Sequence, residues 1–117
     1  MIKVLVIRNN SKLVSISIKG HADYEEYGKD IVCASVSSLV ISTINNIISI
    51  DDKSINVIKE DNNILINNIT NNSITNKLLN NMIIYLEEIC SKYPKNIKII
   101  REEKPWNFWV LIYNYLL

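Results

Sequence analysis

The sequence predicts an α+β fold: a single domain with the element order ββαββαβ, in which two helices pack on one mixed sheet. Three observations support this class. Several short segments alternate apolar and polar residues, two longer segments carry apolar residues three and four positions apart, and both kinds of segment intermix along the chain. A chain of 117 residues and 13.5 kDa suits one domain with one core.

The first elements predict a β-hairpin. Residues 2–7 form an apolar, β-branched run, and residues 13–20 alternate apolar and polar side chains with the period of a half-buried strand. The Asn-Asn-Ser-Lys cluster at residues 9–12 is typical of a turn. Three further strands are predicted at residues 55–60, 64–68 and 97–101, the first two joined as a second hairpin.

Two segments have the spacing of amphipathic helices. The first starts at Asp30, which we place as its N-cap, and residues 51–53 close it. The second runs from Thr70 or Asn72 to Lys92, and Tyr93-Pro94 ends it. Residues 21–29, between the first hairpin and the first helix, show no periodicity, which predicts a mobile loop.

Composition and charge argue against several classes of protein. The net charge is +1, whereas nucleic-acid-binding domains usually carry a strong basic excess, so we expect no direct nucleic-acid partner. The first residues lack the features of a secretory signal, and we expect no segment to reach the roughly 20 apolar residues of a membrane span. These features predict a cytoplasmic protein without a membrane partner, whose two cysteines stay reduced.

Chemistry-bearing residues gather in residues 20–37, which hold the only histidine, both glycines and one of the two cysteines. If Asp30 caps the helix, Cys33 lies in its first turn, where unpaired amides and the helix dipole favour a thiolate and a developing oxyanion. His21 follows the strand directly and is the candidate base. A Cys–His pair at this spacing indicates a cysteine peptidase.

Other residues of the segment have supporting roles in this hypothesis. Gly20 and Gly28 are the two hinges of the predicted loop. Ser37 lies four residues after Cys33, hence on the same helix face, where it can bind substrate. The structural alternatives remain open: a buried cysteine, a surface histidine, an aspartate that only caps and a serine that is only helical. One histidine and one cysteine fall short of a closed zinc site, so we expect no metal.

These residues resemble the signature of a known family. The motifs Gly20-His21-Ala22, Gly28, Asp30-Ile31-Val32-Cys33-Ala34 and Val36-Ser37 are similar to those of the ribosomal-processing cysteine protease Prp family. The resemblance implies a bacterial endopeptidase without a cofactor, with Cys33 as nucleophile and His21 as its base. Asp30, Ser37, Gly20 and Gly28 match further motif positions.

The resemblance also implies a substrate and an assembly. Members of the family remove an N-terminal extension from large-subunit ribosomal protein twenty-seven, and they form homodimers. The resemblance covers residues 1–102 and leaves residues 103–117 as an atypical aromatic tail, which is an extra strand, an oligomer contact, an interfacial anchor or a foreign sequence. Two other functions remain: a non-catalytic ribosome-associated module that binds the peptide, and a thiol-based redox or acyl-transfer protein that uses Cys33.

Overall fold

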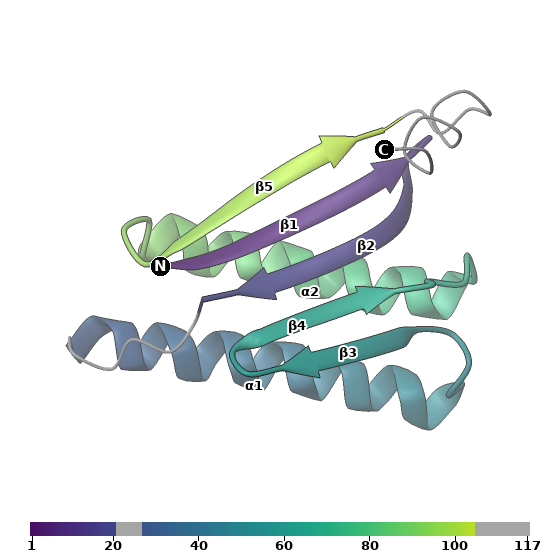
Figure 1. Ribbon diagram of the computed structural model, residues 1–117, viewed down its shortest axis with the longest axis horizontal. Helices are drawn as coiled ribbons and strands as arrows, with labels where there is room; N and C mark the ends of the chain where they lie inside the picture. Colours follow the sequence, from purple (N-terminus) through teal and green to yellow (C-terminus); the bar gives the residue numbers. More distant parts are fainter. Residues whose placement is uncertain (21–26, 105–117) are drawn as a thin grey trace.

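The computed structural model describes residues 1–20 and 27–104 of the 117-residue chain. Their elements follow the order that the sequence predicts (Figure 1). They are β1 (Ile2–Asn9), β2 (Lys12–Lys19), α1 (Tyr27–Ile50), β3 (Asn56–Glu60), β4 (Asn63–Asn67), α2 (Ser73–Lys92) and β5 (Ile97–Glu103). Most of the predicted tail, residues 105–117, lies outside the described residues.

The five strands form one mixed sheet in the order β3-β4-β2-β1-β5. Among the described strands, β1 and β5 pair in parallel, and the other neighbouring pairs are antiparallel. Asn10 and Ser11 make the turn between β1 and β2 with φ values of 50° and 67°. Two successive positive φ values are typical of a type I′ hairpin turn, so residues 9–12 form the predicted turn.

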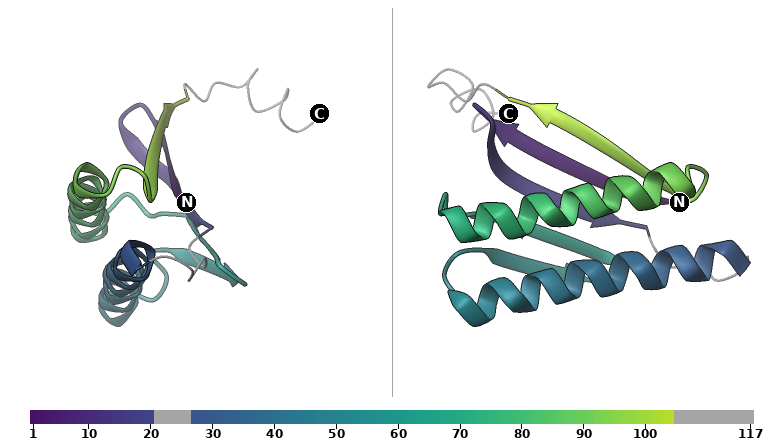
Figure 2. Two further views of the ribbon diagram at one scale, coloured as in Figure 1. Left: turned by 90° about the vertical axis from the view of Figure 1, so that its left-hand side faces the viewer. Right: turned by 180° about the vertical axis from the view of Figure 1, so that it is seen from behind.

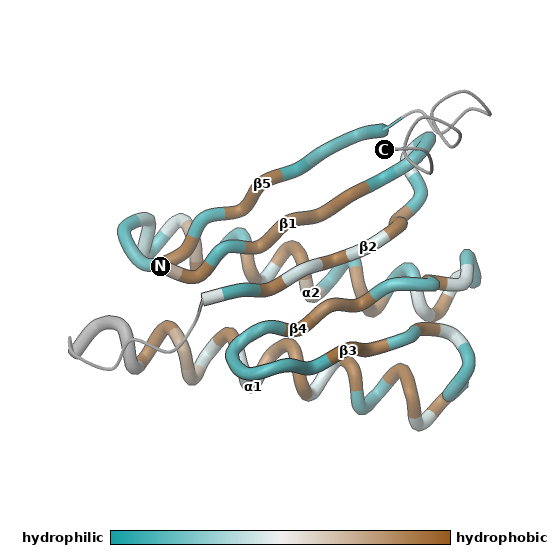
Figure 3. The backbone as a smooth tube through the Cα atoms, viewed as in Figure 1, coloured by the Kyte–Doolittle hydropathy of each residue, from teal (hydrophilic) through white to brown (hydrophobic). Residues whose placement is uncertain are grey.

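Both helices lie on one face of the sheet (Figures 1 and 2). Hydrophobic residues recur along the strands and helices (Figure 3), and their buried side chains form a single core between the two layers. Its fully buried members include Val4, Val6, Ile16, Ile18, Ile66, Val36, Val40, Leu79 and Leu86. No described helix covers the opposite face of the sheet (Figure 2).

Helix α2 has the start and the end that its sequence predicts. Asn72 is the N-cap, and its side-chain oxygen accepts a hydrogen bond of 2.8 Å from the amide of Thr75. At the other end the amide of Tyr93 donates to the carbonyl of Ile89, and Pro94 follows. Leu79 and Leu86 on its inner face are completely buried. Cap and apolar stripe therefore specify the same helix.

Helix α1 overturns the expectation that no segment has the length and hydropathy of a membrane span. Ile31–Ile50 is a 20-residue stretch of mean hydropathy 1.8, because its many isoleucines and valines outweigh its serines and asparagines. A third of the stretch (33%) is buried, and Val36 and Val40 lie in the core of the fold. The core helix of a soluble protein has the same length and composition, so this property alone is weak evidence for a span.

Candidate active site around Cys33

The chain leaves the sheet at Gly20, directly after β2. Its φ is +83°, a conformation that glycine adopts without steric cost. A Cβ at this position would lie 2.8 Å from the main-chain oxygen of Met1, so the backbone leaves no room for a side chain. These two constraints explain a glycine immediately before His21, which itself lies outside the described residues together with the rest of residues 21–26.

Helix α1 begins three residues before its predicted start. Its first residue is Tyr27, so Asp30 is the fourth residue of the helix and not its N-cap. Gly28 is the second residue of the helix and not the hinge of a loop that extends to residue 29. Both predictions were wrong for a physical reason. Aspartate is favoured at the N-cap and in the first turn alike, and glycine is a poor helix former that suggests a loop.

The earlier start changes the surroundings of Cys33. This residue is the seventh of α1, in the second turn and not the first, about 9 Å along the axis from the first residue. The helix dipole acts mainly within the first turn, and the unpaired amides belong to residues 27–30. Because a helical side chain leans over the preceding turn, the thiol extends toward these amides and not away from them.

The Cys33 side chain is half-buried and packs against the hydrophobic core. This position suits a small apolar residue, as the structural alternative holds, and also a nucleophile that one side of the molecule can still reach. Figure 1 shows that β2 ends at the same end of the molecule as the first half of α1. Gly20, from which the chain passes to His21, and Cys33 therefore belong to the same end of the fold.

Ser37 follows Cys33 by four residues on the same unbroken helix, which places the two side chains on one face. It is half-buried and lines a shallow depression of about 560 Å³ with Ala34, Ser38 and Ile41. Of these lining residues, only Ser37 was expected from the sequence to belong to the site. Ala34, Ser38 and Ile41 are spaced four and three residues apart, and this helical spacing was the sequence signal that they share one face.

The side of α1 that faces α2 lines a second concavity. Ile31, Ser35 and Leu39 of α1, Tyr85 of α2 and Tyr93, the C-cap of α2, line a groove of about 380 Å³ between the two helices. Ile31 is 44% exposed and Tyr85 is 54% exposed, so the groove offers apolar surface to a partner. The first half of α1 is thus accessible on two sides, and its third side faces the core.

The second cysteine has a different setting. Cys90 lies near the end of α2, half-buried, and its Sγ donates a hydrogen bond of 3.4 Å to the carbonyl oxygen of Ile97 in β5. No disulfide joins Cys33 and Cys90 in the structure. Across residues 1–20 and 27–104 the structure shows no group of three or more metal-ligating side chains.

The chain is similar to known proteins along most of its length, including residues 20–37. The chain matches the family "Cysteine protease Prp" over residues 1–98. The ribosomal processing cysteine protease Prp of Staphylococcus aureus (strain Mu50) is 31% identical over 98 residues, which cover 81% of this chain and 92% of that protein.

Solved structures agree with the sequence match. The essential ribosomal processing protease Prp from S. aureus in complex with a substrate peptide superposes with a TM-score of 0.80 at 28% identity, covering 86% of this chain and 99% of that one. The same protease with a covalently linked product peptide gives a TM-score of 0.78 at 30% identity and the same coverage. Residues 20–37 lie within the family match, which spans residues 1–98.

Proposed function

The chain belongs to the cysteine protease Prp family, and from this membership we propose an endopeptidase in which Cys33 is the nucleophile and His21 the general base. We propose that its substrate is the precursor of large-subunit ribosomal protein twenty-seven, whose N-terminal extension it removes. One observation carries the proposal. Cys33 lies half-buried on α1, inside the family match, at the end of the molecule where the chain passes from Gly20 to His21.

The proposed reaction has two stages. His21 takes the proton of the Cys33 thiol, and the sulfur attacks the carbonyl carbon of the scissile peptide bond. The tetrahedral intermediate collapses with cleavage of the C–N bond, and His21 gives its proton to the leaving amine. The N-terminal part of the substrate then remains as a thioester on Cys33, which a water molecule activated by His21 hydrolyses. The relative with a covalently linked product peptide supports such a covalent stage.

The position of Cys33 in the second turn assigns the activation of the thiol mainly to His21. At about 9 Å from the first residue of α1, the helix dipole contributes little to a thiolate. We therefore assign Asp30 to stabilising the first turn of α1. Ser37 contacts the bound peptide from the depression on α1, Gly20 shapes the exit from β2, and the proposal requires no cofactor.

Cleavage of a peptide that carries the extension of ribosomal protein twenty-seven tests this function. The wild-type chain is incubated with the peptide under reducing conditions, and mass spectrometry locates the cut. We expect one cut, which is lost in Cys33→Ala and in His21→Ala. Cys90→Ala is the matched control, because it makes the same chemical change at a half-buried position on the other helix.

The outcomes separate the candidate functions. Retained cleavage by a folded Cys33→Ala variant contradicts the assignment of the nucleophile. Binding of the peptide by the wild-type chain without any cut supports the non-catalytic peptide-binding module instead. Circular dichroism spectra of all variants show whether a loss of activity reflects lost structure.

Three further parts of the proposal rest on the family resemblance. The peptidase unit spans residues 1–102, which agrees with a family match that ends at residue 98 and a last strand that ends at Glu103. The protein forms a homodimer, and it acts in the bacterial cytoplasm. Light scattering on the full chain tests the dimer: we expect twice the chain mass of 13.5 kDa, and a monomer at working concentration contradicts it.

A further inference from the structure

The face of the sheet that turns away from the helices carries a row of one residue from each of the five strands, and four of these residues are apolar. Successive side chains of a strand point to opposite faces, so the residues between the core positions face outward. The register pairs Ile100 of β5 with Leu5 of β1, Leu5 with Ser17 of β2, Ser17 with Leu65 of β4, and Leu65 with Ile58 of β3. We call these five residues the open-face row.

The open-face row leaves apolar surface in contact with water. Ile100 is 36% exposed and Ile58 is 42% exposed, and Leu5 and Leu65 are half-buried between neighbouring strands. Ser17, the small residue at the centre, is 8% exposed. Leu5 and Ile100 are direct cross-strand neighbours, and so are Leu65 and Ile58, so the row consists of two apolar pairs with Ser17 between them. We call this arrangement the strip. Exposed apolar side chains that gather on one sheet face are typical of a contact surface.

Polar residues border the strip. The next row on one side holds three lysines in register, Lys98, Lys3 and Lys19. On the other side Glu102 pairs with Ile7, which is half-buried. This pattern of an apolar centre with a charged border is that of a surface which another segment covers, and not of a core.

The segment that follows β5 has the matching composition. Residues 105–117 carry no charge, and ten of these 13 residues are apolar or aromatic, including both tryptophans of the chain. The family match ends before them, at residue 98. A segment of this composition gains free energy by leaving water, and the helix-facing side of the sheet is already filled by α1 and α2.

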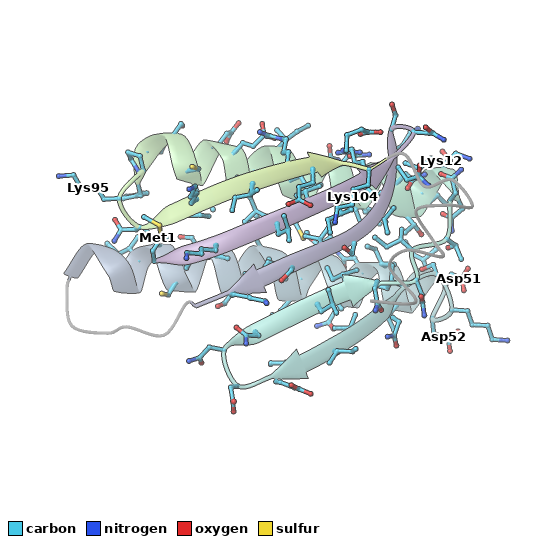
Figure 4. All side chains as sticks on the ribbon, turned by 45° about the horizontal axis from the view of Figure 1, so that its top comes forward. Met1, Lys12, Asp51, Asp52, Lys95 and Lys104 are labelled. Carbon is cyan, nitrogen blue, oxygen red and sulfur yellow. The ribbon has the colours of Figure 1, made fainter. Side chains whose placement is uncertain are left out.

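The segment starts at the end of β5, the edge strand that carries Ile100 of the open-face row. The amide of Lys104 donates a hydrogen bond of 2.8 Å to the carbonyl of Arg8, which fixes the chain at the sheet end where Lys12 lies (Figure 4). The amide of Ser11 donates to the carboxylate of Glu103 at the same end, also at 2.8 Å. An extended chain of 13 residues spans about 43 Å, whereas five strands span about 19 Å from the first to the last axis. The segment is therefore long enough to cross the whole sheet.

We propose that residues 105–117 pack on the open-face row of their own chain and form a third layer over the uncovered face of the sheet. The aromatic side chains of the segment cover the half-exposed isoleucines and leucines, and its polar groups lie toward the lysines and Glu102 at the border. This proposal is independent of the peptidase activity.

Tryptophan fluorescence of the full chain tests the proposal directly, because both tryptophans, Trp106 and Trp109, lie in the segment. We expect emission at a shorter wavelength than that of a free peptide of residues 105–117. In Ile58→Lys and in Ile100→Lys the emission moves toward that of the free peptide, and quenching by acrylamide increases. Both side chains are partly exposed, so the substitutions leave the fold intact, which circular dichroism verifies.

Ile74→Lys and Ile84→Lys are matched controls. These residues are 54% and 51% exposed on α2, on the other side of the sheet, and we expect wild-type emission from both variants. Emission of the wild-type chain equal to that of the free peptide overturns the proposal, as does an equal change in all four variants. A blue shift that appears only as the protein concentration rises assigns the segment to a second copy and overturns the proposal as well. A shift that requires lipid vesicles has the same consequence.

Discussion

The two helices of this protein begin in different ways. Helix α2 starts at the residue that its sequence indicates, with Asn72 as a cap whose oxygen accepts from Thr75, followed by a clear apolar stripe. Helix α1 starts three residues before Asp30, the residue that looks like its cap, and includes a glycine in its first turn. The candidate nucleophile lies on the helix whose start is harder to read.

The local sequence signals agree with the structure at the start of α2 and disagree with it at the start of α1. In α2 the propensity, the cap and the buried stripe all favour the same boundaries, as expected of an element whose role is to stabilise the fold. In α1 the first residue described as buried is Val32, and the sequence just before it shows no aliphatic residues at helical spacing. Residues near a functional site are often those at which these signals disagree.

The largest expected effect on stability is for a core residue of α2, compared with the candidate nucleophile on α1. Leu86→Ala in α2 removes a completely buried side chain and is expected to lower the free energy of unfolding by about 2–5 kcal/mol. Cys33→Ala in α1 removes one half-buried sulfur and is expected to cost about 1 kcal/mol. Urea unfolding followed by circular dichroism measures both. Equal losses would mean that Cys33 has a structural role comparable to that of Leu86.

The two glycines provide the next test. Gly20→Ala places a Cβ 2.8 Å from the Met1 oxygen at a φ of +83°, so it is expected to lower the free energy of unfolding by at least about 1 kcal/mol. Gly28→Ala lies inside α1 and is expected to raise it by up to about 1 kcal/mol. Urea unfolding again measures both. A destabilised Gly28→Ala variant would favour the hinge that the sequence suggests.

Most of the fold was predictable from local sequence patterns, because each of these patterns agrees with the tertiary structure. Alternation in β2, the Asn10-Ser11 turn and the stripe of α2 each reflect a local rule that the tertiary structure also satisfies. The start of α1 was not predictable, because Asp30 stabilises a helix both as cap and in the first turn. The open-face row was not visible either, since it depends on the register between strands that are distant in sequence.

The two helices each carry one cysteine, and we expect these cysteines to differ in reactivity. We expect iodoacetamide at neutral pH to modify Cys33 at least about tenfold faster than Cys90, because the proposal places a base beside Cys33. The Cys90 thiol instead donates to the carbonyl of Ile97. Peptide mapping of timed samples gives the two rates, and labelling in urea shows the rates without structure. Equal and slow labelling of the folded chain contradicts an activated nucleophile on α1.

The smallest expected effects on stability come from substitutions at the starts of the two helices, Asn72 and Asp30. Asn72→Ala removes a capping hydrogen bond between neutral groups, so it is expected to cost about 1 kcal/mol at any salt concentration. Asp30→Ala removes a charge from the first turn of α1, so its cost of about 0.3–1 kcal/mol is expected to disappear in 1 M salt, where charges are screened within about 3 Å.

Asp30→Ser sharpens the distinction, because serine caps as well as aspartate but carries no charge. If Asp30→Ser keeps the wild-type stability while Asp30→Ala loses it at both salt concentrations, Asp30 acts as a cap in solution and α1 begins where the sequence suggests. If both variants lose the same salt-dependent amount, the helix starts at Tyr27, and Cys33 depends on its general base and not on the helix for its reactivity.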